Sequence, residues 1–301
     1  GSVTTTSFTD TEPLDGKNYY QLKATRKGYD SEFASATAIF VPVPTITSAN
    51  VEGKQVVLNW STIENATYIV YCSNDGKTWT TKAGPIAVTS FIDTTPFSQN
   101  NYYKVEAKID DAINVSVVST VFFPYINGHE LVDLGLPSGI KWASMNVGAS
   151  ANSDNGYYFA WGEVAQKSTY TIANSVYTNN STVYISGAAS TDAATHFWGG
   201  TWRMPSVAEF DELVSKCTWK WAAVNGKNGY LITGPNGKSI FLPAAGVKAD
   251  ASLQSGNSGG YYWTGSYYNK DSAWRLNFDS STYTTVYHLK AGGLTIRPVS
   301  E

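Results

Sequence analysis

The feature that most constrains this chain is an internal repeat of nineteen residues. Residues 6–24 read TSFTDTEPLDGKNYYQLKA, and residues 89–107 read TSFIDTTPFSQNNYYKVEA. At the constant offset of 83 residues, ten of the nineteen positions are identical. A period of this length is the size of a small domain, so it predicts tandem domains rather than a solenoid. The two copies also end alike, at Phe40-Val41-Pro42 and at Phe122-Phe123-Pro124.

The repeat divides the first part of the chain into one whole module, residues 44–125, and the carboxyl-terminal half of another, residues 1–43. Within the whole module, apolar residues alternate along 56–60, 68–72 and 103–107, as in strands with one buried face. Asn74-Asp75-Gly76-Lys77 separates two such runs and predicts a hairpin turn. Short alternating strands joined by turns predict a β-sandwich.

Three runs in this region resemble a fibronectin type III domain: Leu-Asn-Trp at 58–60, Tyr-Ile-Val-Tyr at 68–71 and Asn-Tyr-Tyr-Lys-Val at 101–105. The resemblance covers the whole module fully and the half module in part, and other immunoglobulin-like sandwiches share the pattern. It implies that these modules act as spacers. We expect the half module to expose unpaired strand edges and to lack part of its core.

The composition changes after residue 125, because the rest of the chain holds 20 of the 26 Gly and 8 of the 10 Trp. Two helices are expected, Asp192–Trp198 and Ser206–Lys216, and Ser206 with Glu209 forms a capping box at the second. Short apolar runs predict strands around 230–232, 240–242, 261–263, 274–278 and 294–296. Residues 126–301 are therefore predicted to form an α+β domain within a mainly β chain.

A series of landmarks in this second region resembles the Fibrobacter succinogenes major paralogous domain, over about residues 128–300. The resemblance implies a C-type-lectin-like fold related to the formylglycine-generating-enzyme fold, exposure on the surface of Bacteroides-type bacteria, and a binding or adhesive role. The landmarks are Leu131–Gly139, Trp142-Ala143, Asn146-Val147-Gly148, Ala160–Glu163, Gly200–Pro205, Phe241–Gly246, Gly260–Ser266 and Ile296–Val299.

Charge and hydropathy exclude two classes of function. The formal net charge is −3 and no basic run is present, which excludes phosphate-driven binding of nucleic acid. A long uncharged stretch, residues 33–51, contains Pro42 and Pro44, so we expect no transmembrane segment. With the resemblance, this predicts an extracellular protein at the outer-membrane surface, with its signal or a lipid anchor upstream of residue 1.

The sequence predicts no catalytic residue, no cofactor and no metal site. Cys72 and Cys217 lie in different regions and are expected to be buried and unpaired. The Glu-Pro-Asn motif of calcium-binding lectins is absent, and the three His are dispersed. Calcium binding stays open. Carboxylates that a glycan-processing enzyme would need are present but not brought together by sequence, namely Glu130, Asp133, Glu163, Asp271 and Asp279.

Residues 261–291 form the candidate ligand surface. Trp263, Trp274, Leu276 and Phe278 are expected to face the core, and the alternate residues to face outward. Tyr, Ser and Asn suit recognition, because Tyr gives a large contact area at low entropy cost and aromatic faces stack on sugar rings. The alternative is that Tyr-rich loops only cover a Gly-rich sheet. The candidate contact residues are Tyr267, Tyr268, Asn269, Asp271, Arg275, Asn277, Tyr283, Tyr287, His288 and Lys290.

The sequence thus predicts a non-catalytic, adhesin-like cell-surface protein in which sandwich modules space a lectin-like domain from the cell. Its partner would be a protein or glycan of the host or of a neighbouring cell. A purely structural surface or fimbria-associated subunit is the alternative, and a carboxylate-dependent enzyme is a third. Three carboxylates near the start of the second helix, Glu209, Asp211 and Glu212, are explained by the helix dipole.

Overall fold

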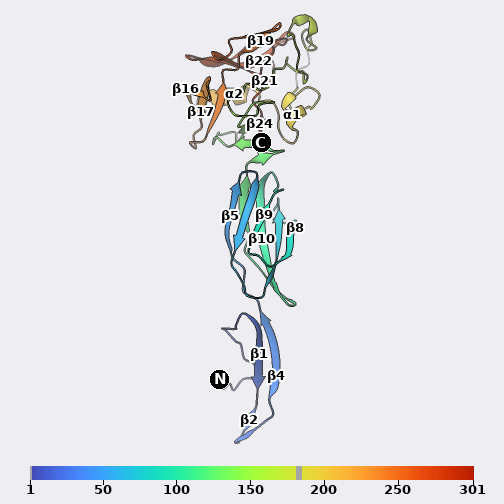
Figure 1. The fold of residues 1–301 in the computed structure, drawn as a ribbon, viewed down its shortest axis with the longest axis vertical. Coiled ribbons are helices and arrows are strands. Elements are labelled where there is room, and N and C mark those ends of the chain that lie inside the picture. Colours follow the sequence, from blue (N-terminus) through green and yellow to red (C-terminus); the bar gives the residue numbers. More distant parts are fainter. Residues whose placement is uncertain (1, 181–184) are drawn as a thin grey trace. The chain divides into compact units, whose positions relative to one another are not determined.

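The computed structural model describes residues 2–180 and 185–301, and the chain divides into two compact units (Figure 1). The amino-terminal unit spans residues 1–123 and the carboxyl-terminal unit spans residues 124–301. Both are built mainly from small antiparallel sheets, as the composition predicts. The division lies within two residues of the predicted boundary. No helix among the described residues is long and apolar enough to cross a membrane.

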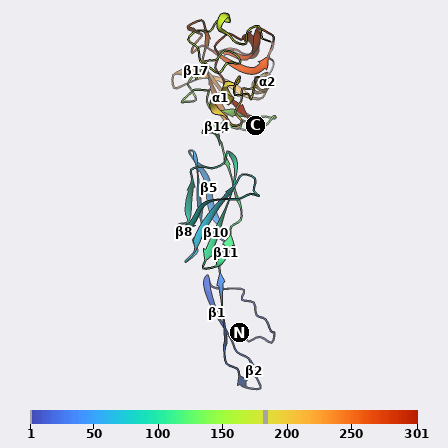
Figure 2. The same cartoon turned by 90° about the vertical axis from the view of Figure 1, so that its right-hand side faces the viewer.

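Residues 46–123 form a two-sheet β-sandwich, because alternate residues of the strands at 55–60, 67–73 and 99–109 point inward. Val56, Leu58, Val70 and Val105 are completely buried between the sheets. Asn74–Lys77 turn between β7 and β8, as predicted. One sheet contains β5 (Ile46–Glu52), β6 (Gln55–Trp60) and β9 (Ser90–Asp93); the other contains β7 (Thr67–Ser73), β8 (Thr80–Ile86), β10 (Gln99–Ile109), β11 (Ala112–Val115) and β12 (Ser119–Phe123) (Figure 1, Figure 2).

The half module repeats the register of the whole one. β1 (Gly16–Leu22) pairs with β4 (Ala34–Phe40) so that Tyr20 lies opposite Ala36, just as Tyr103 lies opposite Ser119 at the same offset. The Tyr20 hydroxyl donates to Asp10 at 2.8 Å, and the Tyr103 hydroxyl donates to Asp93 at the same distance. The sequence repeat is therefore also a repeat of tertiary contacts. A small hairpin of β2 (Thr25–Arg26) and β3 (Tyr29–Asp30) follows β1.

The half module lacks the cover that the whole module has. In the whole module β7 pairs along β10, whereas β1 pairs only with β4 among the described strands. Leu22 is consequently 67% exposed, while its equivalent Val105 is fully buried. Phe8, Tyr20 and Leu22 line an open hollow of about 530 Å³. The predicted open edge and incomplete core are both present.

The carboxyl-terminal unit packs two short helices against several sheets. α1 (Ala193–Trp198) begins after Asp192, and α2 (Val207–Lys216) begins after Ser206 with the predicted capping box. The expected strand at 294–296 is wrong, because Leu294 and Thr295 make only isolated bridges. The strands are β13 (Tyr125–Ile126), β14 (His129–Val132), β15 (Lys141–Ala143), β16 (Thr218–Val224), β17 (Lys227–Thr233), β18 (Ser239–Pro243), β19 (Val247–Ala249), β20 (Ser252–Gln254), β21 (Gly259–Tyr267), β22 (Ser272–Asp279), β23 (Tyr283–Leu289) and β24 (Val299–Ser300), with a 3-10 turn, η1 (Ile172–Asn174).

A buried guanidinium joins the landmark segments. Arg297 is fully buried, and its Nε donates to Asn146 Oδ1 at 2.8 Å. Its two terminal nitrogens donate to the carbonyls of Ala143 at 3.0 Å and Phe241 at 2.8 Å. Burial lowers the pKa of Arg297 to about 10. The Tyr262 hydroxyl, which accepts a hydrogen bond from Asn146, donates in turn to Pro243 O at 2.6 Å.

The landmark tryptophans are structural as well. Trp161 Nε1 donates to Thr264 O at 2.8 Å and Trp263 Nε1 donates to Phe159 O at 2.8 Å, so the two segments bond reciprocally. Both indoles are completely buried. Because a buried indole N–H needs an acceptor, these bonds fix the ring orientations. Trp263 faces the core as predicted.

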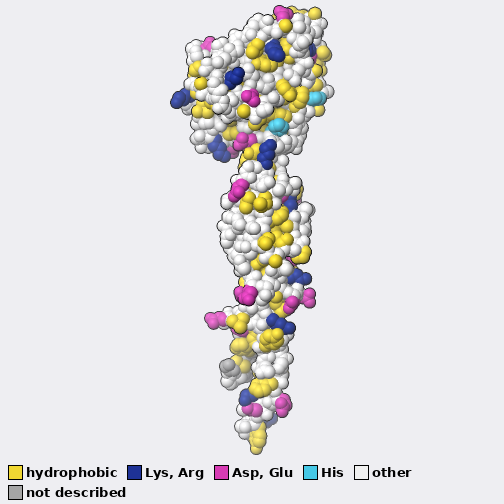
Figure 3. Space-filling model, in the orientation of Figure 1, with side chains coloured by type: hydrophobic (Ala, Val, Ile, Leu, Met, Phe, Trp, Pro, Cys, Tyr) yellow, Lys and Arg dark blue, Asp and Glu magenta, His cyan; other side chains and the backbone are white. Residues whose placement is uncertain are grey.

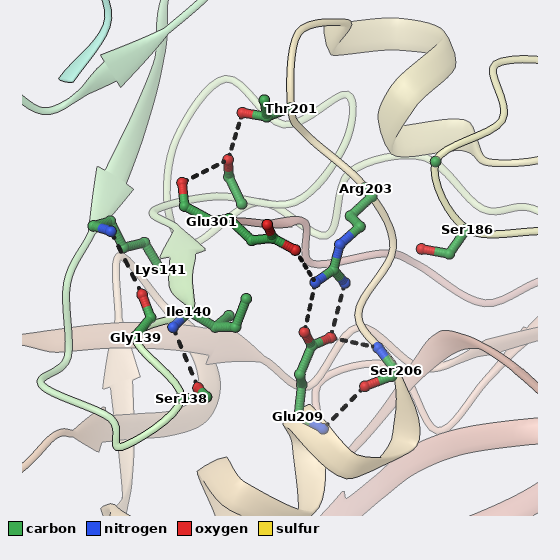
Figure 4. Close-up of polar contacts among 12 residues, drawn as sticks. Ser138, Gly139, Ile140, Lys141, Ser186, Thr201, Arg203, Ser206, Glu209 and Glu301 are labelled. Atoms are coloured by element: carbon green, nitrogen blue, oxygen red, sulfur yellow. Dashed lines mark hydrogen bonds and ion pairs between the residues drawn. The ribbon is translucent and has the colours of Figure 1, made fainter. Parts of the chain in front are cut away.

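A charged cluster closes the start of α2 (Figure 4). Arg203 donates to both carboxylate oxygens of Glu209, at 2.9 and 2.7 Å. Glu209 also accepts from Ser206 N at 2.7 Å, and Ser206 Oγ accepts from Glu209 N at 3.2 Å. The Arg203 guanidinium and these hydrogen bonds outweigh burial and hold the pKa of Glu209 below its ordinary value. Arg203 and Glu209 therefore anchor the helix rather than form a reactive site.

We expect Arg297→Met to lower the free energy of unfolding of the carboxyl-terminal unit by about 3 kcal/mol or more, because three buried acceptors lose their donor. Arg275→Met is the matched control. Arg275 Nε and Nη1 have no hydrogen-bond partner, so the same substitution there should have a much smaller effect. Urea unfolding followed by tryptophan fluorescence measures both. Equal losses would contradict the account.

We also expect Tyr103→Phe to destabilise the sandwich by about 1–2 kcal/mol, since it removes a donor from the buried Asp93 carboxylate. Tyr20→Phe removes the equivalent bond in the half module, where Asp10 is partly exposed to water, and should change stability little. Thermal unfolding of both variants is the measurement. A larger effect at Tyr20 would mean that the half module is the more tightly packed of the two.

Candidate functional site

The sheet of β21, β22 and β23 carries the candidate site on one of its faces. Cross-strand pairing places Trp274 opposite Tyr287, Leu276 opposite Thr285 and Phe278 opposite Tyr283. α2 packs against part of this face, and the Thr285 hydroxyl donates to the Asp211 carboxylate of α2 at 2.6 Å. Leu276 and Phe278 are buried there, as predicted.

At one end of this face lies an aromatic cluster of Tyr268, Trp274 and Tyr287. The Tyr268 and Tyr287 rings are stacked with centroids 4.3 Å apart and planes within 2°. Tyr268 also meets Trp274 edge to face at 5.2 Å and 84°. Tyr268 is 41% exposed and Tyr287 is 55% exposed. Trp274 was expected in the core, but it is only half-buried, since it supports this cluster instead.

The loop that carries Tyr268 is held by its own hydrogen bonds. Asn269 Oδ1 accepts from the backbone N–H of Asp271 at 3.0 Å and of Ser272 at 2.8 Å. The exposed Lys270 ammonium lies 3.5 Å from the Asp271 carboxylate. Asn269 and Asp271, both predicted contact residues, therefore shape the turn at the edge of the aromatic cluster.

Lys290 was predicted to contact ligand, and the structure contradicts this because its side chain is completely buried. Its ammonium donates to the carbonyls of Asn180 at 2.8 Å and Lys270 at 3.1 Å. It also lies over the rings of Trp161 at 4.8 Å and Tyr267 at 4.7 Å. Burial lowers the pKa of Lys290. Lys290 therefore stabilises the 268–271 loop from the buried side, and the Tyr267 ring packs against the same ammonium group.

Tyr283 lies at the opposite end of the face from the aromatic cluster. Its ring stacks on Trp219 with centroids 4.5 Å apart and planes within 6°. It also meets Tyr230 at 5.4 Å, at the margin of the core beside Phe278. Tyr283 therefore covers the core and does not join Tyr268 and Tyr287 in one surface.

The remaining predicted residues, Arg275, Asn277 and His288, belong to the other face of the sheet. The Arg275 guanidinium lies 4.5 Å from the Tyr261 ring centroid, and two of its nitrogens are buried, so it is not the freely exposed group that was expected. Burial, together with the Arg275 charge, lowers the pKa of His288 to about 4. Asn277 is half-buried between Tyr261 and Thr284.

Two further carboxylates, one outside this sheet and one at the end of β22, have structural partners. Glu163 pairs with Lys167 at 2.5 Å and accepts from Val176 N, and Asp279 accepts from the turn residues Ser281 and Thr282. No group of three or more potential metal ligands occurs within residues 2–180 and 185–301. Both cysteines are free, as predicted, but Cys217 is only half-buried because it caps the end of α2.

Comparison with known proteins gives limited matches. A family described as "Domain of unknown function (DUF8237)" matches residues 221–299, which is less than half of the chain. A solved Fn3-like protein from Clostridium thermocellum is 27% identical, with 28% of this chain and 95% of that chain covered and a TM-score of 0.25. No curated protein matches. The sandwich assignment depends on the strand pairing described above, and neither match named here is to a lectin-like protein.

The environment of His288 predicts a pH dependence of stability. Its folded pKa is about 4 against an ordinary value of 6.5, so the unfolded chain takes up a proton first as the pH falls. The stability that neutral His288 contributes is complete above pH 6.5 and is lost as the pH falls towards 4. His288→Gln should therefore reduce the fall in unfolding free energy between pH 7 and pH 4.5. Urea unfolding at both values tests this, and exposed His196→Gln is the control, expected to match the parent protein.

Proposed function

We propose that this chain is a non-catalytic, adhesin-like binding protein of the cell surface. Its carboxyl-terminal unit, with a C-type-lectin-like fold, presents the aromatic cluster to a protein or glycan of the host or of a neighbouring cell. The observation that carries the proposal is the cluster itself. Two tyrosine rings that are about half exposed are stacked on each other, one from β23 (Tyr287) and one from the hydrogen-bonded loop that follows β21 (Tyr268).

Preorganisation supports a binding role. A ring that is already fixed loses little conformational entropy on contact, so more of its contact energy appears as affinity. Here Trp274 packs edge to face against Tyr268, and Lys290 donates a hydrogen bond to the carbonyl of Lys270 in the loop that carries Tyr268. An exposed apolar group rimmed by polar residues is typical of an interaction site.

The landmark series supports the family assignment and, with it, a location on the surface of a Bacteroides-type cell. The repeat supports a spacer role for the sandwich modules. Among the carboxylates that an enzyme would need, Glu163 pairs with Lys167 and Asp279 accepts hydrogen bonds within a turn, which favours binding over catalysis. Under this proposal a lipid anchor or signal belongs to the chain upstream.

A structural or fimbria-associated subunit is the second candidate, and the open half module favours it. β1 offers an unpaired edge, and the hollow lined by Phe8, Tyr20 and Leu22 offers apolar surface to another polypeptide. In that case, Leu22→Asp should abolish assembly into larger particles, while changes in the aromatic cluster should leave assembly intact. Light scattering of the two variants separates the candidates.

We expect the double variant Tyr268→Ala, Tyr287→Ala to lose at least about tenfold in binding to target cells, as when a central aromatic anchor is truncated. Flow cytometry of the labelled full chain on bacterial and epithelial cells measures this. Tyr29→Ala is the control, because Tyr29 is 81% exposed but lies in the amino-terminal unit. Unchanged binding by the double variant, with unchanged thermal stability, would place the contact elsewhere.

A further inference from the structure

We propose that the aromatic cluster, together with Asp211 and Thr285, is a binding site for the ring of a neutral sugar. This inference rests on the proposed function and names its ligand class. The cluster supplies a flat apolar face, and the Asp211–Thr285 pair supplies hydrogen-bond partners for hydroxyl groups on the same side of the sheet. These residues come from β22, β23, the 268–271 loop and α2.

The Tyr287 ring has one face available. Its other face is stacked on Tyr268, and no further ring contact to Tyr287 occurs among the described residues. A pyranose ring has faces made of C–H groups, and these pack against the face of an aromatic ring. Because Tyr268 and Trp274 fix the orientation of Tyr287 before a ligand arrives, the platform requires little reorganisation.

Two polar groups, Thr285 and Asp211, lie beside the exposed face of the Tyr287 ring. Thr285 is two residues from Tyr287 and on the same face, so the two side chains are about 7 Å apart. The Thr285 hydroxyl donates to Asp211 Oδ1 at 2.6 Å. Asp211 Oδ2 makes no hydrogen bond within the part of the chain that the structure describes, and the residue is exposed. A carboxylate oxygen in this position can accept hydrogen bonds from two adjacent sugar hydroxyls.

The charges around the cluster favour a neutral ligand. Lys270, in the loop that carries Tyr268, pairs with Asp271 at 3.5 Å, and Lys290 is completely buried. The Arg275 guanidinium lies on the opposite face of the sheet, against Tyr261. Asp211 would repel a sugar carboxylate or sulfate. Figure 3 shows no continuous patch of Lys and Arg side chains on the visible face of this unit.

The size of the cluster favours a sugar over a protein surface. The exposed apolar side chains here are Tyr268, Tyr287 and the adjoining Leu289, which is 46% exposed. A stable protein interface buries about 800 Å² on each partner, or some 20–30 residues. Three neighbouring side chains are far fewer, but they suffice to cover one or two sugar rings.

The test is titration calorimetry of the full chain with neutral gluco-, xylo-, manno- and galacto-oligosaccharides, and with oligogalacturonate as the acidic probe. We expect binding of at least one neutral series and none of the acidic probe. Tyr287→Ala should weaken binding at least about tenfold. Tyr287→Phe should retain it, because the ring and not the hydroxyl makes the contact. Asp211→Asn should weaken it about threefold to tenfold, and Tyr29→Ala should leave it unchanged.

A parallel measurement separates this inference from the proposed function. Labelled chain is bound to target cells before and after mild periodate oxidation, which cleaves vicinal diols in glycans. Cell binding that depends on Tyr287 but resists periodate, with no oligosaccharide bound, overturns the sugar assignment and leaves the binding role intact. Absence of cell binding, or binding that Tyr287→Ala does not change, overturns both. Preference for oligogalacturonate would overturn the assignment to a neutral ligand.

Discussion

The carboxyl-terminal unit depends on one buried cation, the guanidinium of Arg297. Removing a charge from water is costly unless hydrogen bonds compensate, and here each nitrogen of the guanidinium donates to an acceptor: Asn146, Ala143 O or Phe241 O. Three segments far apart in sequence are thereby fixed to one point. Asn146 also bonds to the Tyr262 hydroxyl, so the first strand of the β21–β23 sheet is tied to the same centre. Most of the landmark segments contribute a residue to this hydrogen-bonded cluster around Arg297.

The position of the aromatic cluster follows from that framework. Tyr262 and Trp263 fix β21, β22 and β23 pair onto it, and α2 covers only part of the resulting face. Where the cover of α2 ends, Trp274 and Tyr287 reach the surface. Lys290 then holds the adjoining loop against the framework through two carbonyls. The core therefore fixes the orientation of the exposed Tyr268 and Tyr287 rings, and a fixed orientation favours recognition.

Much of this architecture could be predicted from the sequence, because it depends on local patterns. The offset repeat predicted the half module with its open edge and incomplete core, and the capping box predicted the start of α2. The errors at Trp274 and Lys290 share one cause. Alternation along a strand tells which residues share a face, but not which of them another element covers. Asp211 was missed for a related reason, since its partner Thr285 is 74 residues away and only the tertiary fold brings α2 beside β23.

The central claim is that the landmark residues build a scaffold and that contact is made by the separate aromatic cluster. Hydroxyl-radical footprinting of the full chain, free and bound to target cells, tests it most directly. The account predicts that oxidation of Tyr268 and Tyr287 falls on binding, while oxidation of the exposed tyrosines of the amino-terminal unit, Tyr19 and Tyr29, is unchanged. Protection of those tyrosines, or of exposed Phe197 and Leu253, with Tyr268 and Tyr287 still reactive, would contradict it.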